Sequence, residues 1–138
     1  MPRDAILILE DNAERRAYFT SAVASLPGIS LVVWPDTPSM IRELPDWLGR
    51  ARLVSLDHDL NPQHPDSPDP LTGFEAAAFL ATQTPCCPVI LHTTNYLRVE
   101  SMDRELRDGG WPTFQIRPFR DDWIERFWLP KVRELIAQ

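Results

Sequence analysis

The chain has 138 residues, of which 43% are hydrophobic and 25% charged, and its formal net charge is −6. These values are typical of one globular domain over residues 1–138 that buries its own core. The negative charge argues against bulk binding to nucleic acid or an anionic membrane, because both need clustered Lys and Arg. No apolar run approaches the ~18 residues of a membrane span and no leader peptide opens the sequence, so we expect a cytoplasmic protein.

The first half of the sequence alternates between strand and helix patterns. The predicted elements are a strand over 5–9, a helix over 13–26, a strand over 29–34, a helix over 37–48 and an apolar strand that ends at Leu56. Asn12 is the expected cap of the first helix, whose apolar face carries Tyr18, Phe19, Val23 and Leu26. Pro45 falls inside the second helix and leaves its length uncertain.

The second half begins with a proline-rich stretch, 61–70, that no regular element can accommodate and that must be a loop. The predicted elements after it are a helix opened by Thr72, a strand over 88–91, a helix to about Asp108, a strand over 113–116 and a helix from Asp121 or Asp122 that Pro130 kinks. The adjacent Cys86 and Cys87 suit neither a fold-stapling disulfide nor a zinc knuckle, so we expect buried thiols.

Five strands that alternate with helices indicate an α/β fold with a parallel sheet and right-handed crossovers. Charged and polar residues follow four of these strands. They are Glu10 and Asp11, then Asp57, His58 and Asp59, then His92, Thr93, Thr94 and Asn95, and finally Arg117. Because ligands collect outside the carboxyl ends of parallel strands, we expect these side chains to surround one site. The alternative for each acid is that it only begins a solvated loop.

Three of these residues, Glu10, Asp11 and Asp57, are the candidate metal ligands. A site of carboxylate oxygens without cysteine suits Mg²⁺, or Mn²⁺, better than zinc. Arg117 would offer paired donors to a phosphate, and Thr93 could hydrogen-bond one of its oxygens. The competing interpretation is a set of mutual salt bridges that needs no ligand.

Two histidines extend this set, because imidazole titrates near neutral pH and can act as acid or base on a phosphodiester. The candidate catalytic residues are therefore Asp57, His58, Asp59, His92, Thr93 and Arg117. We favour His92 over His58, since side-chain alternation can turn His58 and Asp57 to opposite faces. Either histidine could instead be a hydrogen-bonded structural residue, and His64 is expected to be solvated.

The ordered set of Glu10-Asp11, Asp57, the Thr72-Gly73-Phe74-Glu75 helix start, Thr93 and Arg117-Pro118-Phe119 resembles the receiver domains of response regulators. The resemblance spans nearly the whole chain. It implies a doubly wound, flavodoxin-like fold with strand order 2-1-3-4-5. It also implies that Glu10 and Asp11 hold Mg²⁺, that Asp57 takes a phosphoryl group from a histidine kinase, and that Thr93 reorients afterwards.

The chain departs from ordinary receivers where Arg117 replaces the lysine before proline, and where fifteen residues separate Asp57 from Gly73. The Asp57-His58-Asp59-Leu60 and His92-Thr93-Thr94-Asn95 blocks are also unusual for receivers. With these departures the sequence is similar to the cyclic-phosphate-processing receiver domains, which implies action on cyclic phosphate termini or cyclic nucleotides. Arginine in place of a mobile lysine argues against phosphorelay switching but keeps phosphate binding.

Three hypotheses follow from the sequence. The first is a Mg²⁺-dependent site that binds or hydrolyses a phosphate ester of a small molecule or nucleotide terminus, as a metal-dependent phosphoesterase or cyclic phosphodiesterase would. The second is a phosphoacceptor receiver whose partner is a histidine kinase acting on Asp57. The third is an inert receiver-like module that binds another protein through an aromatic surface of Trp123, Phe127 and Trp128.

Overall fold

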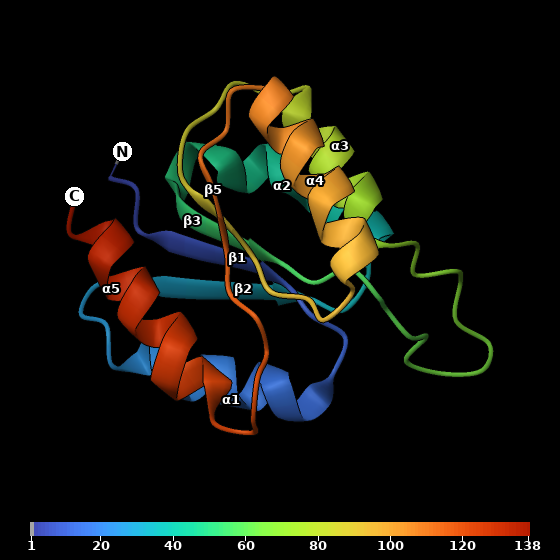
Figure 1. Cartoon of the computed structure of the whole chain (residues 1–138), viewed down its shortest axis with the longest axis horizontal. Coiled ribbons are helices and arrows are strands. Elements are labelled where there is room, and N and C mark those ends of the chain that lie inside the picture. Colours follow the sequence, from blue (N-terminus) through green and yellow to red (C-terminus); the bar gives the residue numbers. More distant parts are fainter. Residues whose placement is uncertain (1) are drawn as a thin grey trace.

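The computed structural model describes residues 2–138 and contains one parallel sheet of five strands (Figure 1). The strands are β1 (Ala5–Leu9), β2 (Ser30–Trp34), β3 (Ala51–Leu56), β4 (Val89–Leu91) and β5 (Thr113–Gln115). Their order is β2-β1-β3-β4-β5, and every neighbouring pair is parallel. The predicted fold class and strand order are therefore confirmed.

Helices cover both faces of this sheet, which makes the fold doubly wound (Figure 1). The helical segments are α1 (Ala13–Ala24), α2 (Thr37–Trp47), η1 (Leu48–Arg50), α3 (Gly73–Ala81), α4 (Tyr96–Asp108), η2 (Ile124–Trp128) and α5 (Leu129–Ile136). One layer holds α1 and α5, and the other holds α2, α3 and α4. Within residues 2–138, no helix has the length and apolar character needed to cross a membrane.

Alternate residues of the central strands face two separate cores. Leu7 and Leu9 of β1 pack with the α2, α3 and α4 layer, whereas Ile6 and Ile8 pack with the α1 and α5 layer. All five residues of β1 are fully buried. Burial on both faces explains why the sequence shows a continuous apolar run and no alternation.

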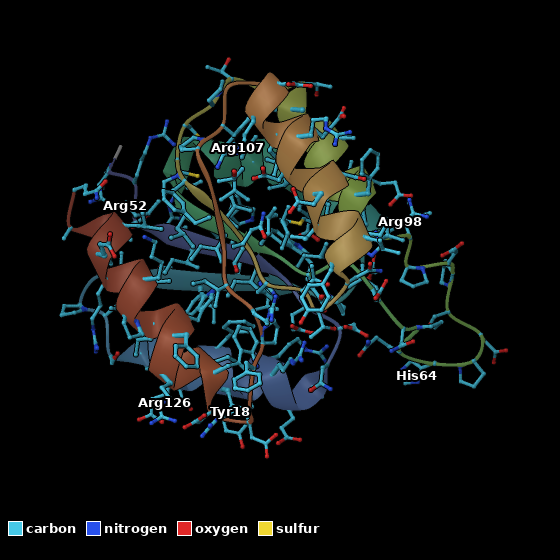
Figure 2. All side chains as sticks on the ribbon, in the orientation of Figure 1. Tyr18, Arg52, His64, Arg98, Arg107 and Arg126 are labelled. Carbon is cyan, nitrogen blue, oxygen red and sulfur yellow. The ribbon has the colours of Figure 1, made fainter. Side chains whose placement is uncertain are left out.

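The first helix agrees with the prediction except at one residue. The Asn12 side chain accepts from the backbone N–H of Arg15, which is the expected cap. Phe19, Val23 and Leu26 are buried, but Tyr18 is 48% exposed and points away from the core (Figure 2). The expectation that Tyr18 belongs to the apolar face was wrong, because the 3.6-residue period leaves it at the edge of that stripe.

The last helix opens with a π-helical turn, Ile124–Trp128, and continues as α5. Pro130 lies in the first turn of α5 and has no N–H to donate, which fits the break in the regular hydrogen-bond pattern at this point. Trp123 and Trp128 are buried inside the monomer, and Phe127 is 43% exposed. The predicted exposed surface of three aromatic rings is therefore wrong for both tryptophans, and the third hypothesis loses its main support.

Candidate metal and phosphate site

Three neighbouring strands deliver buried polar side chains to one point at the carboxyl edge of the sheet. Glu10 follows β1, Asp57 follows β3 and His92 follows β4, and one ligand atom from each lies within 4.8 Å of the others. Glu10 and His92 are fully buried, and Asp57 is nearly so. Two carboxylates and an imidazole thus share a small volume from which bulk water is largely excluded.

His92 is held by hydrogen bonds at both ring nitrogens. Its Nδ1 lies 2.6 Å from Ser55 Oγ, and its Nε2 lies 3.2 Å from Glu10 Oε1. Trp128 Nε1 donates to the same Ser55 hydroxyl at 3.0 Å, and the Trp123 ring stacks on the imidazole at 5.6 Å between centroids. An imidazole with both nitrogens hydrogen-bonded and the rings of Phe19 and Trp123 packed against it is fixed in place. This arrangement suits a residue that positions Glu10.

Arg15 is a member of the site that the sequence reasoning missed. Its Nη1 lies 3.6 Å from Glu10 Oε1 and 4.0 Å from Asp57 Oδ2, while its guanidinium sits 5.4 Å from the centroid of the Trp123 ring. Its side chain is 31% exposed, so it reaches the acids from the solvent side. One signal in the sequence could have indicated Arg15. It lies in the first turn of the helix that follows β1, and this turn borders the carboxyl edge of the sheet.

The two carboxyl groups of the site have pKa values shifted in opposite directions. Burial and the nearby charge of Glu10 raise the pKa of Asp57 to about 8, although Arg15 and the His58 N–H act against this. Burial alone would raise the pKa of Glu10, but His92 and the Asn12 N–H outweigh it and leave the pKa below its usual range. The site therefore holds more potential negative charge than one partly exposed arginine offsets. The carboxylate oxygens of Glu10 and Asp57 form a hard donor set that fits Mg²⁺ or Mn²⁺.

Asp11 lies beside this cluster and binds the proline-rich loop. Its Oδ2 accepts from the backbone N–H of Asn61 at 2.7 Å, and its carbonyl oxygen accepts from Gln63 Nε2 at 3.0 Å. Burial raises the pKa of Asp11. Beyond this anchor the loop projects from the molecule, with His64 on the projecting part, as predicted for a solvated residue (Figure 2).

His58 belongs to a second group of hydrogen bonds at the same edge. Its Nδ1 lies 2.8 Å from Asp59 Oδ1, and both carboxylate oxygens of Asp59 accept from Asn95 Nδ2 at 3.2 Å. Its Nε2 makes no hydrogen bond within residues 2–138, where the one buried side-chain polar atom left without a partner is Trp111 Nε1. The His58 side chain is only 7% exposed, so the imidazole is largely shielded from bulk water.

Thr93 and Arg117 complete the predicted residues. Thr93 is buried, and its hydroxyl accepts from the backbone N–H of Asn95 at 3.1 Å. Arg117 is exposed, and its guanidinium lies 4.4 Å from the centroid of the Tyr96 ring. No ion pair within residues 2–138 joins Arg117 to a carboxylate; the one arginine within 4.0 Å of Asp57 there is Arg15.

Gly73 is required by the close approach of α3 to the strand end. A Cβ at this position would lie 1.8 Å from the carbonyl oxygen of Asp57, and the Gly73 N–H donates to His58 O at 2.9 Å. Thr72 and Glu75 form the capping box that starts the helix. The long loop therefore leaves the site at Asp57 and returns to it at Gly73.

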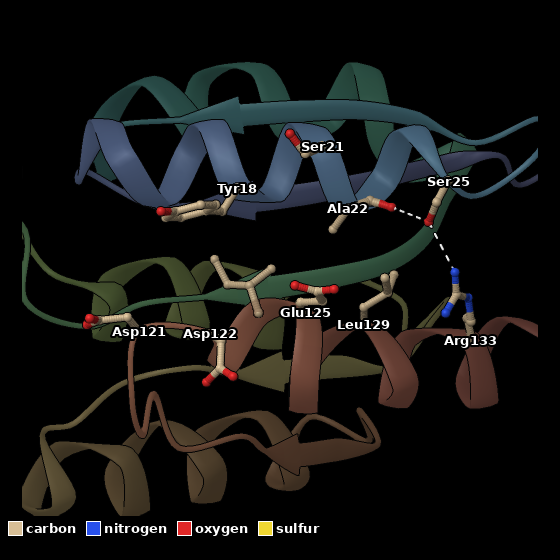
Figure 3. Close-up of a pocket in the computed structure, with 10 residues that line it drawn as sticks. Tyr18, Ser21, Ala22, Ser25, Asp121, Asp122, Glu125, Leu129 and Arg133 are labelled. Carbon is tan, nitrogen blue, oxygen red and sulfur yellow. Dashed lines mark hydrogen bonds between the residues drawn. The ribbon is translucent and has the colours of Figure 1, made fainter.

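A groove with a volume of about 790 Å³ lies elsewhere, between α1 and the segment formed by η2 and α5 (Figure 3). Its lining includes Tyr18, Asp122, Glu125 and Arg133, and Arg133 donates to Ser25 Oγ at 3.2 Å. None of the residues that line it belongs to the Glu10, Asp57 and His92 cluster. The candidate site is thus separate from this groove.

Solved structures similar to this chain are receiver domains. The response regulator domain of CheB from Thermotoga maritima is 17% identical, with a TM-score of 0.66 and coverage of 98% of this chain and 97% of that one. A receiver domain from Rhodospirillum rubrum is 20% identical, with a TM-score of 0.64 and coverage of 96% and 90%. The CheX-CheY-BeF3-Mg complex from Borrelia burgdorferi is 16% identical, with a TM-score of 0.66 and coverage of 97% and 87%. At these identities the likeness concerns the fold.

No match was found among curated proteins. Residues 6–108 match the family described as cyclic-phosphate processing Receiver domain. That range includes β1 to α4, and with them the acids, both site histidines and Arg15. The chain belongs to the cyclic-phosphate processing receiver domain family.

Proposed function

We propose that this receiver domain binds a divalent cation and a phosphate ester at the carboxyl edge of its sheet, and that it hydrolyses a cyclic phosphate there. The observation that carries the proposal is the buried Glu10 and Asp57 pair, whose charge is offset within 4.0 Å by Arg15 at the solvent boundary. Buried carboxylates are stable when they are paired or when they coordinate a metal. The family description supports a cyclic phosphate as the substrate class.

The residues that would hold the cation are Glu10 and Asp57, with Asp11 next to them along the chain. Bound Mg²⁺ or Mn²⁺ would supply positive charge at the phosphoryl oxygens and polarise the phosphorus centre. His92 positions the Glu10 carboxylate by its 3.2 Å hydrogen bond and is itself fixed by Ser55. We therefore assign His92 a positioning role in place of the acid–base role that the sequence suggested.

Arg15 is our candidate for the phosphate-binding cation. It stands between the acids and solvent, and the planar guanidinium offers paired donors that match phosphate oxygens. The sequence suggested Arg117 for this task, but Arg117 packs on the exposed ring of Tyr96. Arg117 would then contact a more distant part of the ligand at the same edge of the sheet.

His58 is our candidate acid–base group. Its Nδ1 is paired with Asp59, which the Asn95 amide orients in turn, and its Nε2 makes no hydrogen bond within residues 2–138 although the side chain is largely buried. A carboxylate that holds one imidazole nitrogen leaves the other free to take or give a proton. Thr93 supports the group indirectly, because its hydroxyl accepts from the Asn95 N–H.

The test is turnover of 2′,3′- and 3′,5′-cyclic nucleotides by the purified chain with Mg²⁺ or Mn²⁺. We expect metal-dependent hydrolysis, lowered by roughly 10²-fold or more in His58→Asn, since general acid–base catalysis contributes about that factor. His64→Asn is the matched control, because His64 lies on the exposed loop, and its activity should equal that of the wild type. If the wild type turns over none of these substrates, the hydrolytic proposal is wrong. If His58→Asn is as active as His64→Asn, His58 is not the acid–base group.

A second candidate is a phosphoacceptor role for Asp57 with a histidine kinase as partner. It is favoured by the free side of that carboxylate, because Asp57 Oδ2 has only the long contact with Arg15, whereas Oδ1 accepts from the His58 N–H. Beryllofluoride with Mg²⁺ should then form an adduct that Asp57→Asn abolishes. Such an adduct in a protein without turnover would favour this role over hydrolysis.

A further inference from the structure

The opposite edge of the sheet holds a second chemical feature, which involves both cysteines of the chain. Cys86 and Cys87 lie in the segment between α3 and β4, and their sulfur atoms are 3.9 Å apart. Both line a recess of about 260 Å³ that also includes Arg3, Arg52 and Phe114. This recess is at the amino ends of the strands, remote along each strand from the acidic cluster.

The two thiols differ in their surroundings. Cys86 is partly exposed, and its Sγ lies 3.6 Å from Leu48 O, whereas Cys87 is buried and packs with the core of the α2, α3 and α4 layer. The hydrogen bond with Cys87 and the positive charge of Arg3 lower the pKa of Cys86 to about 7. Cys86 and burial together raise the pKa of Cys87. One thiol is thus accessible in an electropositive place, and the other is a protected neighbour.

Two arginines, Arg3 and Arg52, line this recess. Its lining residues within the described part of the chain include no acidic side chain. Arg3 Nη1 donates to Leu48 O at 2.8 Å and to Ala51 O at 3.2 Å, which fixes its guanidinium near Cys86. Arg52 donates to the carbonyl oxygens of Ile136 and Gln138 beside the end of α5 (Figure 2). Fixed cations and partial exposure are the surroundings in which a cysteine reacts as a thiolate.

We propose that Cys86 and Cys87 form an oxidisable dithiol, in which Cys86 reacts with a hydroperoxide and Cys87 resolves the product to a disulfide between the two neighbours. In the first step the Cys86 sulfur attacks one peroxide oxygen, the O–O bond breaks, and the leaving oxygen takes a proton. Cys86 becomes a sulfenic acid. The Cys87 sulfur then attacks Cys86, and water leaves with the Cys87 proton. The two thiols lose two electrons, which reduce one hydroperoxide.

Closure of a disulfide between adjacent residues requires an adjustment of the local backbone, because their Cα atoms are about 3.8 Å apart and those of most disulfides are farther apart. The sulfur atoms must close from 3.9 Å to about 2.05 Å, the length of a disulfide bond. Residues 82–88 lie outside helices and strands, so the adjustment breaks no regular element. The change would draw Cys86 Sγ away from Leu48 O, while Val54 N still donates to Pro88 O and keeps the next strand in place.

The test is brief treatment of the full chain with hydrogen peroxide, followed by alkylation and intact-mass measurement. We expect the wild type to lose the mass of two hydrogen atoms and both alkylation sites. Cys87→Ser should stop at a sulfenic acid on Cys86 that dimedone traps, and Cys86→Ser should react much more slowly. Arg3→Gln should slow alkylation of Cys86 at pH 7 by about twofold to threefold, because a smaller thiolate fraction is partly compensated by higher nucleophilicity.

Two results would overturn the proposal. One is a wild type that keeps both thiols under peroxide while unfolded chain loses them. The other is equal oxidation of Cys86→Ser and Cys87→Ser, which would mean that the two positions do not differ in role. Circular dichroism of each variant distinguishes a chemical effect from loss of the fold. Mg²⁺ titration of the oxidised protein tests whether oxidation of the cysteines leaves metal binding at the acidic cluster unchanged.

Discussion

The acidic residues at the two edges of the sheet differ in their burial and in their distance from an arginine. At the amino edge Asp4 makes a two-point contact with Arg50, at 3.0 and 3.2 Å, in a partly exposed position. At the carboxyl edge Glu10 and Asp57 are buried and share Arg15 at 3.6 and 4.0 Å. A short, partly exposed pair is a structural contact, whereas buried acids with one more distant cation leave capacity for a ligand. This difference is an electrostatic reason to propose the ligand site at the carboxyl edge.

Substitution of glycine should have the largest effect, and it should differ between the edges. Gly73→Ala at the carboxyl edge should lower the free energy of unfolding by about 3–5 kcal/mol, because its Cβ would overlap the Asp57 carbonyl. Gly49→Ala at the amino edge meets no atom within 4 Å and should change stability little. Urea unfolding of both variants measures the difference, and equal losses would mean that α3 does not approach the strand end this closely.

Substitution of Asp57 and of Asp4 should change the stability of the protein in opposite directions. The pKa of Asp57 is raised from 3.8 to about 8 in the folded protein. Between pH 3.8 and pH 8 the folded state therefore binds more protons than the unfolded state. The contribution of Asp57 to stability falls as the pH rises through this range. Asp57→Asn should therefore be more stable than the wild type above pH 8, by about 1–3 kcal/mol. Arg50 lowers the pKa of Asp4, so Asp4→Asn should lose stability instead.

Thermal unfolding from pH 5 to 9 in the absence of divalent ions measures both effects. Addition of Mg²⁺ should then raise the unfolding temperature of the wild type more than that of Asp57→Asn, since ligand binding to the folded state stabilises it. A loss of stability in Asp57→Asn at pH 9 would contradict the unbalanced charge that we assign to the carboxyl edge.

Substitution of the arginines should have the smallest effect. Arg15→Gln removes a cation that competes with a metal ion for Glu10 and Asp57, so Mn²⁺ affinity should rise by roughly 3-fold to 10-fold, or about 1 kcal/mol. Affinity for inorganic phosphate in the presence of the metal should fall. Arg52→Gln at the amino edge is the control and should change neither value. Calorimetry measures both, and unchanged Mn²⁺ affinity in Arg15→Gln would remove Arg15 from the site.

Much of the fold could be predicted because each central strand is apolar on both faces and ends in a polar residue. The same pattern predicted that Glu10, Asp57 and His92 would meet. Arg15 could not be placed, because its reach depends on how α1 lies against the carboxyl edge. The stacking of Arg117 on Tyr96 also depends on side-chain directions that the sequence does not encode locally.

The roles of the two histidines were also beyond the sequence. His92 follows a buried strand, as a catalytic histidine could, but Ser55 and Glu10 occupy both of its nitrogens. Ser55 is an inward residue of a strand more than thirty positions earlier, so the pairing needs the parallel alignment of β3 and β4. His58 was the less favoured candidate, although the Asp59 carboxylate beside it was visible in the sequence.

The π-helical turn before α5 affects the candidate site, although the site residues lie much earlier in the sequence. In a regular α-helix, residues five apart are rotated by roughly 140° beyond a full turn, at about 100° per residue. Because the turn at Ile124–Trp128 is wider, Trp123 and Trp128 both point toward His92. Trp123 stacks on the His92 ring, and Trp128 donates a hydrogen bond to Ser55, which in turn bonds to His92. The π-helical turn thus sets the direction of the two indoles that hold His92 and, through it, the carboxylate of Glu10.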